Sequence, residues 1–251
     1  MFKIIFNYRF DLIWIRIFKV LSCLAFPNLW VIFCKGVVPG FEHIKAIKKI
    51  KSINTLVDCG SNKGQFAIIL FSLNNYKKYI SFDPIIQPNI LKKYLNKRGV
   101  SSENYQVALS NISSIKPFFI TERKDSSSLK KTTKNANVYF SDLNYKKTIN
   151  VEVKTLDTYE SLIKDSPSPR IIKIDVQASE IDLINGASKT LKYFDYIFIE
   201  VSFEILYLGI ASNEDLFFKL SEQGFQEIFS YNSLKRRGKL ISKDFLFKRL
   251  N

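Results

Sequence analysis

The chain has 251 residues, of which 46% are hydrophobic and 24% are charged, and its formal net charge is +15 at neutral pH. This length and composition support a single α/β core with a small extension, and the sequence contains no repeat or low-complexity tract. Its three widely spaced cysteines, Cys23, Cys34 and Cys59, exclude a disulfide framework and a zinc site, so a reducing cytoplasm is the expected compartment.

Positive charge is spread along the chain, with local clusters at residues 45–51, 130–134 and 235–239. No aromatic-interleaved nucleic-acid module accompanies these clusters, so no specific nucleic-acid partner is expected. An anionic membrane lipid or a phosphate-linked substrate is at least as good a partner as RNA. A solvated, lysine-rich surface is the simpler explanation for much of the excess charge.

The first 50 residues are predicted to form an apolar, basic helical extension to a main domain over residues 51–251. The longest uncharged run, residues 20–34, has fifteen residues and contains Pro27, so it is shorter than the ~18 residues that a membrane-spanning helix needs. Charges interrupt the apolar part, which argues against a signal peptide. Residues 1–34 are therefore expected to pack on the domain, to form a homodimer contact, or to lie on an anionic membrane as an amphipathic helix.

A glycine-rich turn follows the first predicted strand, Thr55–Val57, and opens a helix over about residues 64–75. The turn lacks the Lys-Ser/Thr pair that follows the last glycine of a P-loop. Asn62 stands where the dinucleotide fingerprint needs its second glycine, so neither phosphate-binding motif fits. Asp58 would repel a pyrophosphate, but it suits a ligand with an amino group or a positive charge.

The second predicted strand, residues 78–82, ends at Asp83, which is placed to accept hydrogen bonds from ribose hydroxyls. A nucleoside with a cationic amino-acid tail fits both Asp58 and Asp83, and S-adenosylmethionine is the common cofactor of that shape. The alternative is a capped turn followed by an ordinary surface Asp-Pro turn.

Strands and helices continue to alternate along the rest of the chain. The predicted helices cover residues 87–98, 179–191 and 213–223, and a capping box of Ser179 and Asp182 opens the second of them. The predicted strands cover residues 105–109, 170–174 and 196–201, followed by an antiparallel pair at 225–231 and 244–248. Two β-like pieces, at 116–121 and 149–154, lie in an otherwise irregular region. This alternation predicts an α/β fold with a mostly parallel sheet and a C-terminal antiparallel hairpin.

Four acids end predicted strands and should meet in one crevice at the carboxyl edge of the sheet: Asp58, Asp83, Asp175 and Glu200. Lys173 shares a strand face with Asp175 by the two-residue period. A single such acid is most simply a helix cap or a loop hydrogen-bond acceptor. Four together repel one another unless a cation or a donor compensates, which indicates a functional site.

The stretch around "KIDVQASEIDLINGA" resembles the signature of the FkbM family of S-adenosylmethionine-dependent methyltransferases, through Lys173, Asp175, Val176, Gln177, Glu180, Gly186 and Ala187. The first turn resembles the same family through Val57, Asp58, Gly60, Asn62, Gly64, Gln65 and Phe66. Shorter matches lie at residues 42–43, 125–129, 200–207 and 244–247, so the resemblance covers about residues 36–250. It implies a class I methyltransferase (Rossmann-like) fold with a seven-stranded sheet and S-adenosylmethionine as cofactor.

By position, the resemblance implies a cofactor site made of Asp58, Gly60, Ser61, Asn62, Gly64 and Gln65 at the methionine part, Asp83 at the ribose, Gln106, Val107 and Ala108 at the adenine, and Asp175 near the methyl group. Two departures stand out. Asp83 replaces the usual Glu but still carries a carboxylate. Ala178 replaces a glycine, which puts a tight backbone approach at that position in doubt.

The resemblance also implies O-methylation of a sugar or glycan hydroxyl, with a lipid-linked glycan as one form of acceptor. The catalytic candidates are Asp175, Glu200, His43 and Lys173, and the substrate-binding candidates are Glu42, Ser126, Ser127, Ser128, Gln177 and Glu180. His43, the one histidine, competes with Asp175 and Glu200 for the role of general base, and the two acids would be the ligands of an Mg²⁺ ion if one is used. Two alternatives are a cofactor-binding subunit without transfer activity and, on charge alone, an RNA methyltransferase.

Overall fold

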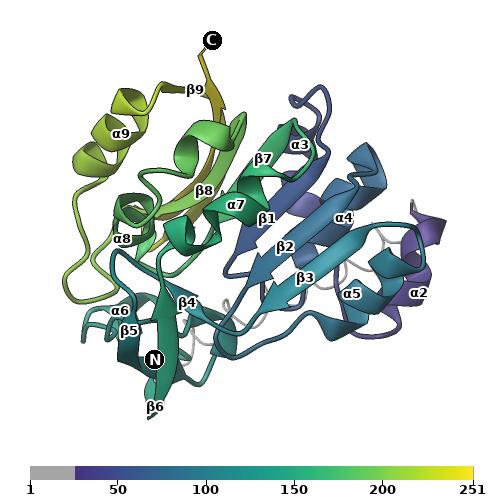
Figure 1. Cartoon of the computed structure of the whole chain (residues 1–251). Helices are drawn as coiled ribbons and strands as arrows, with labels where there is room; N and C mark the ends of the chain where they lie inside the picture. The colour runs from purple at the N-terminus through teal and green to yellow at the C-terminus, as the bar shows by residue number, and fades with distance from the viewer. Residues whose placement is uncertain (1–25, 251) are drawn as a thin grey trace.

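The central sheet has seven strands in the order β3-β2-β1-β7-β8-β10-β9 (Figure 1), in a computed structural model that describes residues 26–250. The strands are β1 (Thr55–Cys59), β2 (Lys78–Phe82), β3 (Ser101–Tyr105), β7 (Arg170–Ile174), β8 (Tyr196–Ser202), β9 (Phe225–Arg236) and β10 (Lys239–Arg249). The pairings are parallel except those of β10, which runs antiparallel to β8 and β9. The predicted mostly parallel sheet with a C-terminal antiparallel hairpin is confirmed.

Helices cover both faces of this sheet, because successive strand residues point to opposite sides. Leu56 packs on one side with helices α2 (Trp30–Phe33), α3 (Ile44–Ile47), α4 (Gln65–Asn74) and α5 (Asn89–Asn96), and Val57 packs on the other side with α7 (Glu160–Lys164), α8 (Glu180–Asn185) and α9 (Asn213–Glu222). Short 3-10 turns lie at Pro27–Leu29, Phe41–His43, Lys124–Ser126, Leu156–Tyr159 and Leu191–Tyr193. The sheet is therefore the middle layer of three.

A second, three-stranded sheet corrects one predicted strand. It consists of β4 (Ala108–Leu109), β6 (Tyr145–Lys154) and β5 (Ser114–Thr121), in that order, and α6 (Ala136–Tyr139) lies between β5 and β6 in the chain. The single strand predicted at 105–109 is wrong, since β3 ends at Tyr105 and β4 belongs to this other sheet. β3 is an edge strand of polar residues, so it lacks the apolar pattern that marks a buried strand.

The helix predicted over residues 179–191 is shorter, and its capping box does not form. α8 ends at Asn185, and a Cβ on the next residue, Gly186, would lie 2.1 Å from the carbonyl oxygen of Ser110. The chain therefore turns at this close approach. The Ser179 side chain makes no capping hydrogen bond, and the Asp182 carboxylate lies 3.2 Å from Lys130 Nζ instead.

The described part of the N-terminal segment contributes to the main core. Leu29, Ile32, Ala46 and Ile47 are buried in the same cluster as the apolar residues of α4 and β1. The expectations for residues 1–34 otherwise fall on residues 1–25, which lie outside the described part of the chain. Among residues 26–250, no helix is long and apolar enough to cross a membrane.

Candidate active site

A cavity of about 350 Å³ opens at the carboxyl ends of β1, β2, β7 and β8. Among the sequence-predicted residues, Glu42, His43, Gly60, Ser61, Asn62, Gln65, Asp83, Val107, Ala108, Ser127, Lys173, Asp175, Gln177 and Glu200 line it. Asp58, Gly64, Gln106, Ser126, Ser128 and Glu180 are not in its wall. Sequence reasoning assigned no role to several other lining residues: Phe82, Ile85, Ile86, Leu109, Phe118, Arg123, Lys124, Asp125, Asn232 and Asp244.

The turn after β1 needs glycine because it packs directly against the chain that leaves β7. Gly60 has φ +77°, and a Cβ on it would lie 1.9 Å from the carbonyl oxygen of Asp175. Gly64 has φ +83°, and its Cβ would lie 2.1 Å from a methyl carbon of Leu91. Gly60 thus allows the turn and the β7 loop to form adjacent walls of the cavity, and Gly64 allows the turn to pack on Leu91 of α5.

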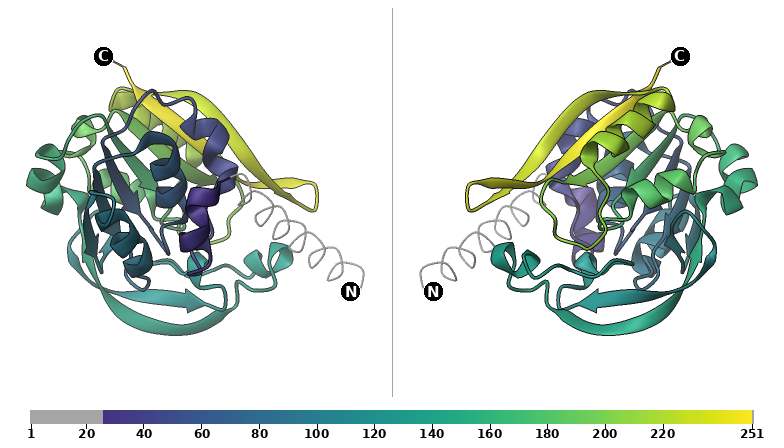
Figure 2. Two further views of the ribbon diagram at one scale, coloured as in Figure 1. Left: turned by 90° about the vertical axis from the view of Figure 1, so that its right-hand side faces the viewer. Right: turned by 90° about the vertical axis from the view of Figure 1, so that its left-hand side faces the viewer.

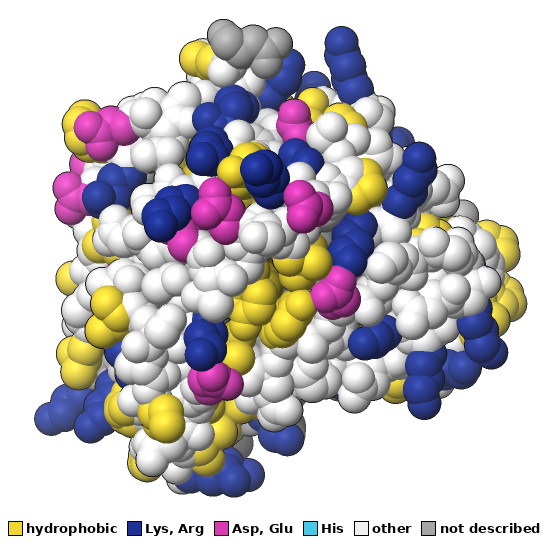
Figure 3. Space-filling model, viewed as in Figure 1, with side chains coloured by type: hydrophobic (Ala, Val, Ile, Leu, Met, Phe, Trp, Pro, Cys, Tyr) yellow, Lys and Arg dark blue, Asp and Glu magenta, His cyan; other side chains and the backbone are white. Residues whose placement is uncertain are grey.

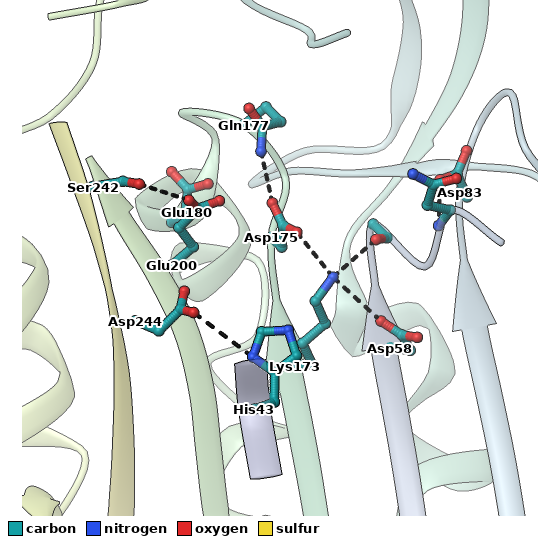
Figure 4. A network of polar contacts seen from close by, with 12 residues as sticks. His43, Asp58, Asp83, Lys173, Asp175, Gln177, Glu180, Glu200, Ser242 and Asp244 are labelled. Atoms are coloured by element: carbon teal, nitrogen blue, oxygen red, sulfur yellow. Dashed lines mark hydrogen bonds and ion pairs between the residues drawn. The ribbon is translucent and has the colours of Figure 1, made fainter. Parts of the chain in front are cut away.

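Lys173 joins the same two walls with its ammonium group (Figure 4). Its Nζ donates to the carbonyl oxygen of Gly60 and to Asp175 Oδ2, each at 3.0 Å, and lies 3.7 Å from Asp58 Oδ1. Burial lowers the pKa of Lys173, but the charges of Asp175 and Asp58 outweigh it and the net shift is upward. Lys173 therefore stays charged and holds the β1 turn to the β7 loop.

Asp58 is completely buried behind this turn rather than in the cavity wall. Its Oδ2 accepts a hydrogen bond from the hydroxyl of Tyr79 at 3.3 Å. Burial raises the pKa of Asp58 to about 6, against the opposing effect of Lys173. Asp58 thus acts on the site indirectly, through its ion pair with Lys173.

Asp83 lies at the end of β2 and organises two loops. Its Oδ1 accepts from the backbone N–H groups of Ile85 and Ile86 at 2.9 and 2.7 Å, and its Oδ2 accepts from the N–H of Asn62 at 3.0 Å. Burial raises the pKa of Asp83 although these hydrogen bonds lower it. A carboxylate offers about four acceptor positions, so roughly one is left to face the cavity.

Two carboxylates and one histidine gather at the β8–β10 side of the cavity. Glu200 Oε1 accepts from Ser242 Oγ at 2.8 Å, and Asp244 Oδ2 accepts from Asn232 Nδ2 at 2.7 Å. Asp244 is opposite Glu200 in the antiparallel register of β10 and β8. Burial and the negative charge of Asp175 raise the pKa of Glu200 to about 7, and burial and Glu200 raise the pKa of Asp244.

His43, the last residue of the 3-10 turn Phe41–His43, lies next to Asp244. Its Nδ1 lies 2.8 Å from the hydroxyl of Tyr231 and 3.7 Å from Asp244 Oδ2 (Figure 4), and its ring packs edge-on against Phe66 and Phe198. The histidine is thus held in one orientation at the cavity wall by aromatic packing and two polar neighbours.

Asp175 has the opposite electrostatic environment to Glu200. Its Oδ1 accepts from Gln177 Nε2 at 2.7 Å, and its Oδ2 from Lys173. Burial raises the pKa of Asp175, but Lys173 and these hydrogen bonds outweigh it and the net shift is downward. Asp175 therefore remains ionised near neutral pH, whereas Glu200 is able to gain or lose a proton there.

The serine run serves mainly to fix the neighbouring loop. Ser128 Oγ donates to the carbonyl oxygen of Gln177 at 2.5 Å, the carbonyl of Ser126 accepts from the hydroxyl of Tyr207 at 2.8 Å, and Ser127 Oγ accepts from the N–H of Thr121 at 3.2 Å. Tyr207 also donates to Gln177 Oε1 at 3.0 Å. Only Ser127 of the three lines the cavity.

Glu180 and Gln106 also lie off the cavity wall. Glu180 Oε1 accepts from the N–H of Ala178 at 3.1 Å, and burial raises the pKa of Glu180 to about 7. The exposed side chain of Gln106 donates to the carbonyl oxygen of Pro84 at 3.4 Å, while the next two residues, Val107 and Ala108, line the cavity. Val107 and Ala108 lie in an apolar part of the cavity wall together with Phe82, Ile85, Leu109 and Phe118.

The β1–β2 side of the cavity fits the cofactor that the sequence implies. The backbone turn at Gly60 has no room for a side chain, and Asp83 retains an acceptor position. Ser61 borders the cavity, and its buried Oγ has no hydrogen-bond partner among the described residues. In residues 26–250, no group of three or more His, Cys, Asp or Glu side chains is arranged to hold a metal ion.

Comparisons with known proteins agree with this geometry at the level of the family. The model of the methyltransferase FkbM domain matches residues 58–227. The curated proteins that were compared gave no match.

Solved structures similar in fold include the magnesium protoporphyrin IX methyltransferase of Synechocystis PCC 6803 with bound S-adenosylmethionine, at 10% identity and TM-score 0.44, over 82% of this chain and 74% of that chain. The M1A22 tRNA methyltransferase TrmK of B. subtilis is similar at 8% identity and TM-score 0.44, over 84% of this chain and 66% of that chain. An rRNA methylase of Streptococcus thermophilus is similar at 13% identity and TM-score 0.41, over 83% of this chain and 94% of that chain.

The sheet order, the glycine turn after β1 and the acid after β2 define a class I methyltransferase that uses S-adenosylmethionine. Because the family model covers about two thirds of the sequence, the chain belongs to the FkbM methyltransferase domain family.

Proposed function

We propose that the protein methylates a hydroxyl of a neutral, polyhydroxylated acceptor such as a sugar or glycan. The observation that carries this proposal is Glu200, a carboxyl group in the cavity wall whose pKa burial raises to about 7. A hydroxyl must lose its proton as it is methylated, and a base is most effective when its pKa lies near the working pH. Glu200 meets this requirement.

The three candidate bases differ in their fitness for this role. Asp175 is bound by Lys173 and Gln177 and has a lowered pKa, so it is the weakest base of the three. His43 Nδ1 is engaged by the hydroxyl of Tyr231. The Glu200 carboxylate accepts a hydrogen bond from Ser242 at Oε1, and its other lone pairs remain for the hydroxyl of an acceptor. These contacts favour Glu200 as the base and Asp175 as a group that orients the acceptor.

The charge of the cavity favours a neutral acceptor over a nucleic acid. Six acidic residues line it: Glu42, Asp83, Asp125, Asp175, Glu200 and Asp244. The basic residues in the wall are Arg123, Lys124 and Lys173, and Lys173 is already paired with acids. A phosphate backbone would be repelled here, whereas sugar hydroxyls can donate to carboxylates and accept from Asn232 and Gln177.

The cavity has two ends with separate tasks. Asp83, Gly60 and the apolar residues near Val107 would hold the cofactor, and Glu200, Asp244 and Asn232 would hold the acceptor. When bound, S-adenosylmethionine supplies an activated methyl group on a sulfonium. The residues of this chain align the acceptor oxygen, exclude water and accept the proton of the hydroxyl at Glu200.

A methyl-transfer assay on a panel of acceptors tests the proposal. Purified protein is incubated with methyl-labelled S-adenosylmethionine and either methyl glycosides, surface polysaccharide of the source cells or total RNA. The proposal predicts labelled sugar, with S-adenosylhomocysteine formed in equal amount. Label in RNA would instead support the nucleic-acid alternative, and cofactor binding without label in any acceptor would support the non-catalytic subunit.

A further inference from the structure

Three segments that are distant in the sequence form one continuous face beside the acceptor end of the cavity. They are residues 130–139, 203–211 and 233–243, and we call them together the basic face. The N–H of Leu208 donates to the carbonyl of Lys131, the N–H of Thr133 to Leu206, each at 2.8 Å, and the N–H of Phe203 to Ile241 at 2.7 Å. Both views of Figure 2 place the turn of the β9–β10 hairpin on the same side of the molecule as α6.

The middle segment exposes aliphatic side chains. Ile205 is 64% exposed and Leu208 is 56% exposed, and Phe203 and Val138 beside them are also exposed. Isolated exposed apolar residues are ordinary, but four large ones on two adjoining segments, 130–139 and 203–211, form a patch. A patch of this kind gains free energy when an apolar phase covers it.

The flanking segments carry an unusual excess of positive charge. The three segments contain eight cations, Lys130, Lys131, Lys134, Lys235, Arg236, Arg237, Lys239 and Lys243, and a single acid, Glu204, so their net charge is +7 of the total of +15. Lys130 is paired with Asp182, outside the three segments, which leaves the net charge of the face at +6. Glu204 lies 3.4 Å from Lys239 Nζ and bridges to the hydroxyl of Tyr139 at 3.0 Å. On the face that Figure 3 shows, by contrast, Lys and Arg side chains are scattered among Asp and Glu.

We propose that the basic face binds an anionic lipid surface, with Ile205 and Leu208 inserted among the lipids and the surrounding Lys and Arg side chains at the head groups. Aliphatic residues on one side with cations around them match the composition of protein surfaces that lie in a membrane interface. The attraction of the cations to anionic head groups falls off within a Debye length, so binding weakens as salt is added.

RNA fits this face less well than lipid does. Single-stranded nucleic acids bind through aromatic side chains on which bases stack, together with a cationic groove. The most exposed apolar residues here, Ile205 and Leu208, are aliphatic and cannot stack. A second copy of this chain is also disfavoured, since two faces with the same large positive charge would repel one another.

The basic face adjoins the acceptor side of the cavity through Tyr207. This residue lies between the exposed Leu208 and the buried Leu206, and its hydroxyl donates to Gln177 Oε1, which faces Asp175 through its amide nitrogen. A membrane at this face would lie near the opening used by the acceptor. Lipid binding itself does not depend on which acceptor the enzyme methylates.

Vesicle flotation with matched variants of the full chain tests the proposal. The test variant is Ile205→Ser, Lys134→Glu, Arg237→Glu. The control variant is Ile90→Ser, Lys93→Glu, Lys97→Glu, which makes the matching change in charge and apolar surface on α5 and its C-cap residue, at the opposite edge of the sheet (Figure 1). All are measured on phosphatidylcholine vesicles with and without phosphatidylglycerol, and thermal unfolding and S-adenosylmethionine binding report on folding.

The proposal predicts that the wild type and the control float with the anionic vesicles, that added salt reverses this, and that the test variant loses at least about tenfold in affinity while it stays folded. Equal losses in both variants would show diffuse attraction without a specific face. Unchanged binding of the test variant would place the lipid contact elsewhere in the chain. The proposal would also be overturned if the wild type did not float with anionic vesicles, or if it bound RNA in place of vesicles.

Discussion

At the residue scale, the site gives two neighbouring carboxylates different properties by means of their surroundings. Asp175 receives hydrogen bonds from Lys173 and Gln177, so its pKa falls below the usual range. Glu200 is buried near the negative charge of Asp175, and its pKa rises to about 7. Environments that separate the pKa values of two acids are a common way to assign separate roles to them.

Replacing Glu200 tests its role as base. Glu200→Gln keeps the shape and the acceptor oxygen for Ser242 but removes the basic carboxylate, so kcat should fall by about 10²- to 10⁴-fold. In the wild type the base must be ionised, so kcat/KM should fall about tenfold per pH unit below pH 7 and level off above it.

The pH profile of wild-type methyl transfer, measured beside the variant, separates catalysis from structure. The acidic limb should be absent from the residual activity of Glu200→Gln. An unchanged limb in this variant would assign the titration to another group, with His43 as the next candidate.

Ala178 is a second residue whose environment has opposing effects. Its φ is +75°, a conformation that disfavours a Cβ by about 1–2 kcal/mol. Its methyl group is nevertheless buried in the cluster with Phe140 and Leu206, which is worth about 0.8 kcal/mol. Ala178→Gly should therefore change the free energy of unfolding by only about 1 kcal/mol or less, in the stabilising direction.

Ala178→Val provides the comparison, because a β-branched residue suits this backbone least and must also fit a filled cluster. Urea denaturation should show a loss of at least about 2 kcal/mol for Val. A clear destabilisation by Gly, of a size similar to that by Val, would mean that packing alone controls this position.

At the scale of elements, the site depends on how closely the loops after β1 and β7 approach each other. Gly60 touches the backbone of Asp175, and Lys173 holds both loops with one ammonium group. The sequence allowed the strands that carry these residues to be predicted, because β1, β2, β7 and β8 are mostly buried, apolar runs with an acid near the carboxyl end of each. It did not locate β3, which has a polar edge sequence.

The cavity residues on the β9–β10 hairpin and on the loop after β5 could not be predicted from the sequence pattern. Asn232, Asp244 and Arg123 reach the cavity only through tertiary packing of β9, β10 and the loop after β5, which no local pattern encodes. One signal was available, because the family resemblance at residues 244–247 begins at Asp244.

A pair of glycine variants tests the close approach of these loops. Gly60→Ala and Gly99→Ala both place a Cβ at a similar positive φ, +77° and +79°, but the added atom meets the Asp175 carbonyl at 1.9 Å in the first and nothing within 4 Å in the second. The difference between them isolates the contact. Gly99→Ala should lose about 1 kcal/mol of stability and retain cofactor affinity.

Gly60→Ala should lose at least tenfold in S-adenosylmethionine affinity, or roughly 1.4 kcal/mol, with a larger loss of stability. Calorimetric titration and thermal unfolding measure both quantities. Equal behaviour of the two variants would show that φ, rather than the approach of the β7 loop, is what Gly60 provides.

At the scale of the whole molecule, residues 26–50 share the core of the catalytic domain. Leu29 is completely buried, whereas Val31, two positions later, is 55% exposed. Leu29→Ala should therefore cost about 2–5 kcal/mol of stability, while Val31→Ala should cost less than about 0.5 kcal/mol. Chemical denaturation checks this, and equal, small effects would show that the segment folds apart from the domain.

The two ends of the cavity provide the most direct test of the account as a whole. The central claim is that the Asp83 end binds the cofactor and the Glu200 end accepts the proton, so the measurement is calorimetric titration of S-adenosylmethionine into the wild type, Asp83→Ala and Glu200→Gln, with unfolding temperatures as a control for folding. We predict that Asp83→Ala weakens binding by at least about tenfold and that Glu200→Gln, despite its low kcat, binds as the wild type does. Wild-type affinity in Asp83→Ala, or parallel loss of affinity in Glu200→Gln, would contradict the account.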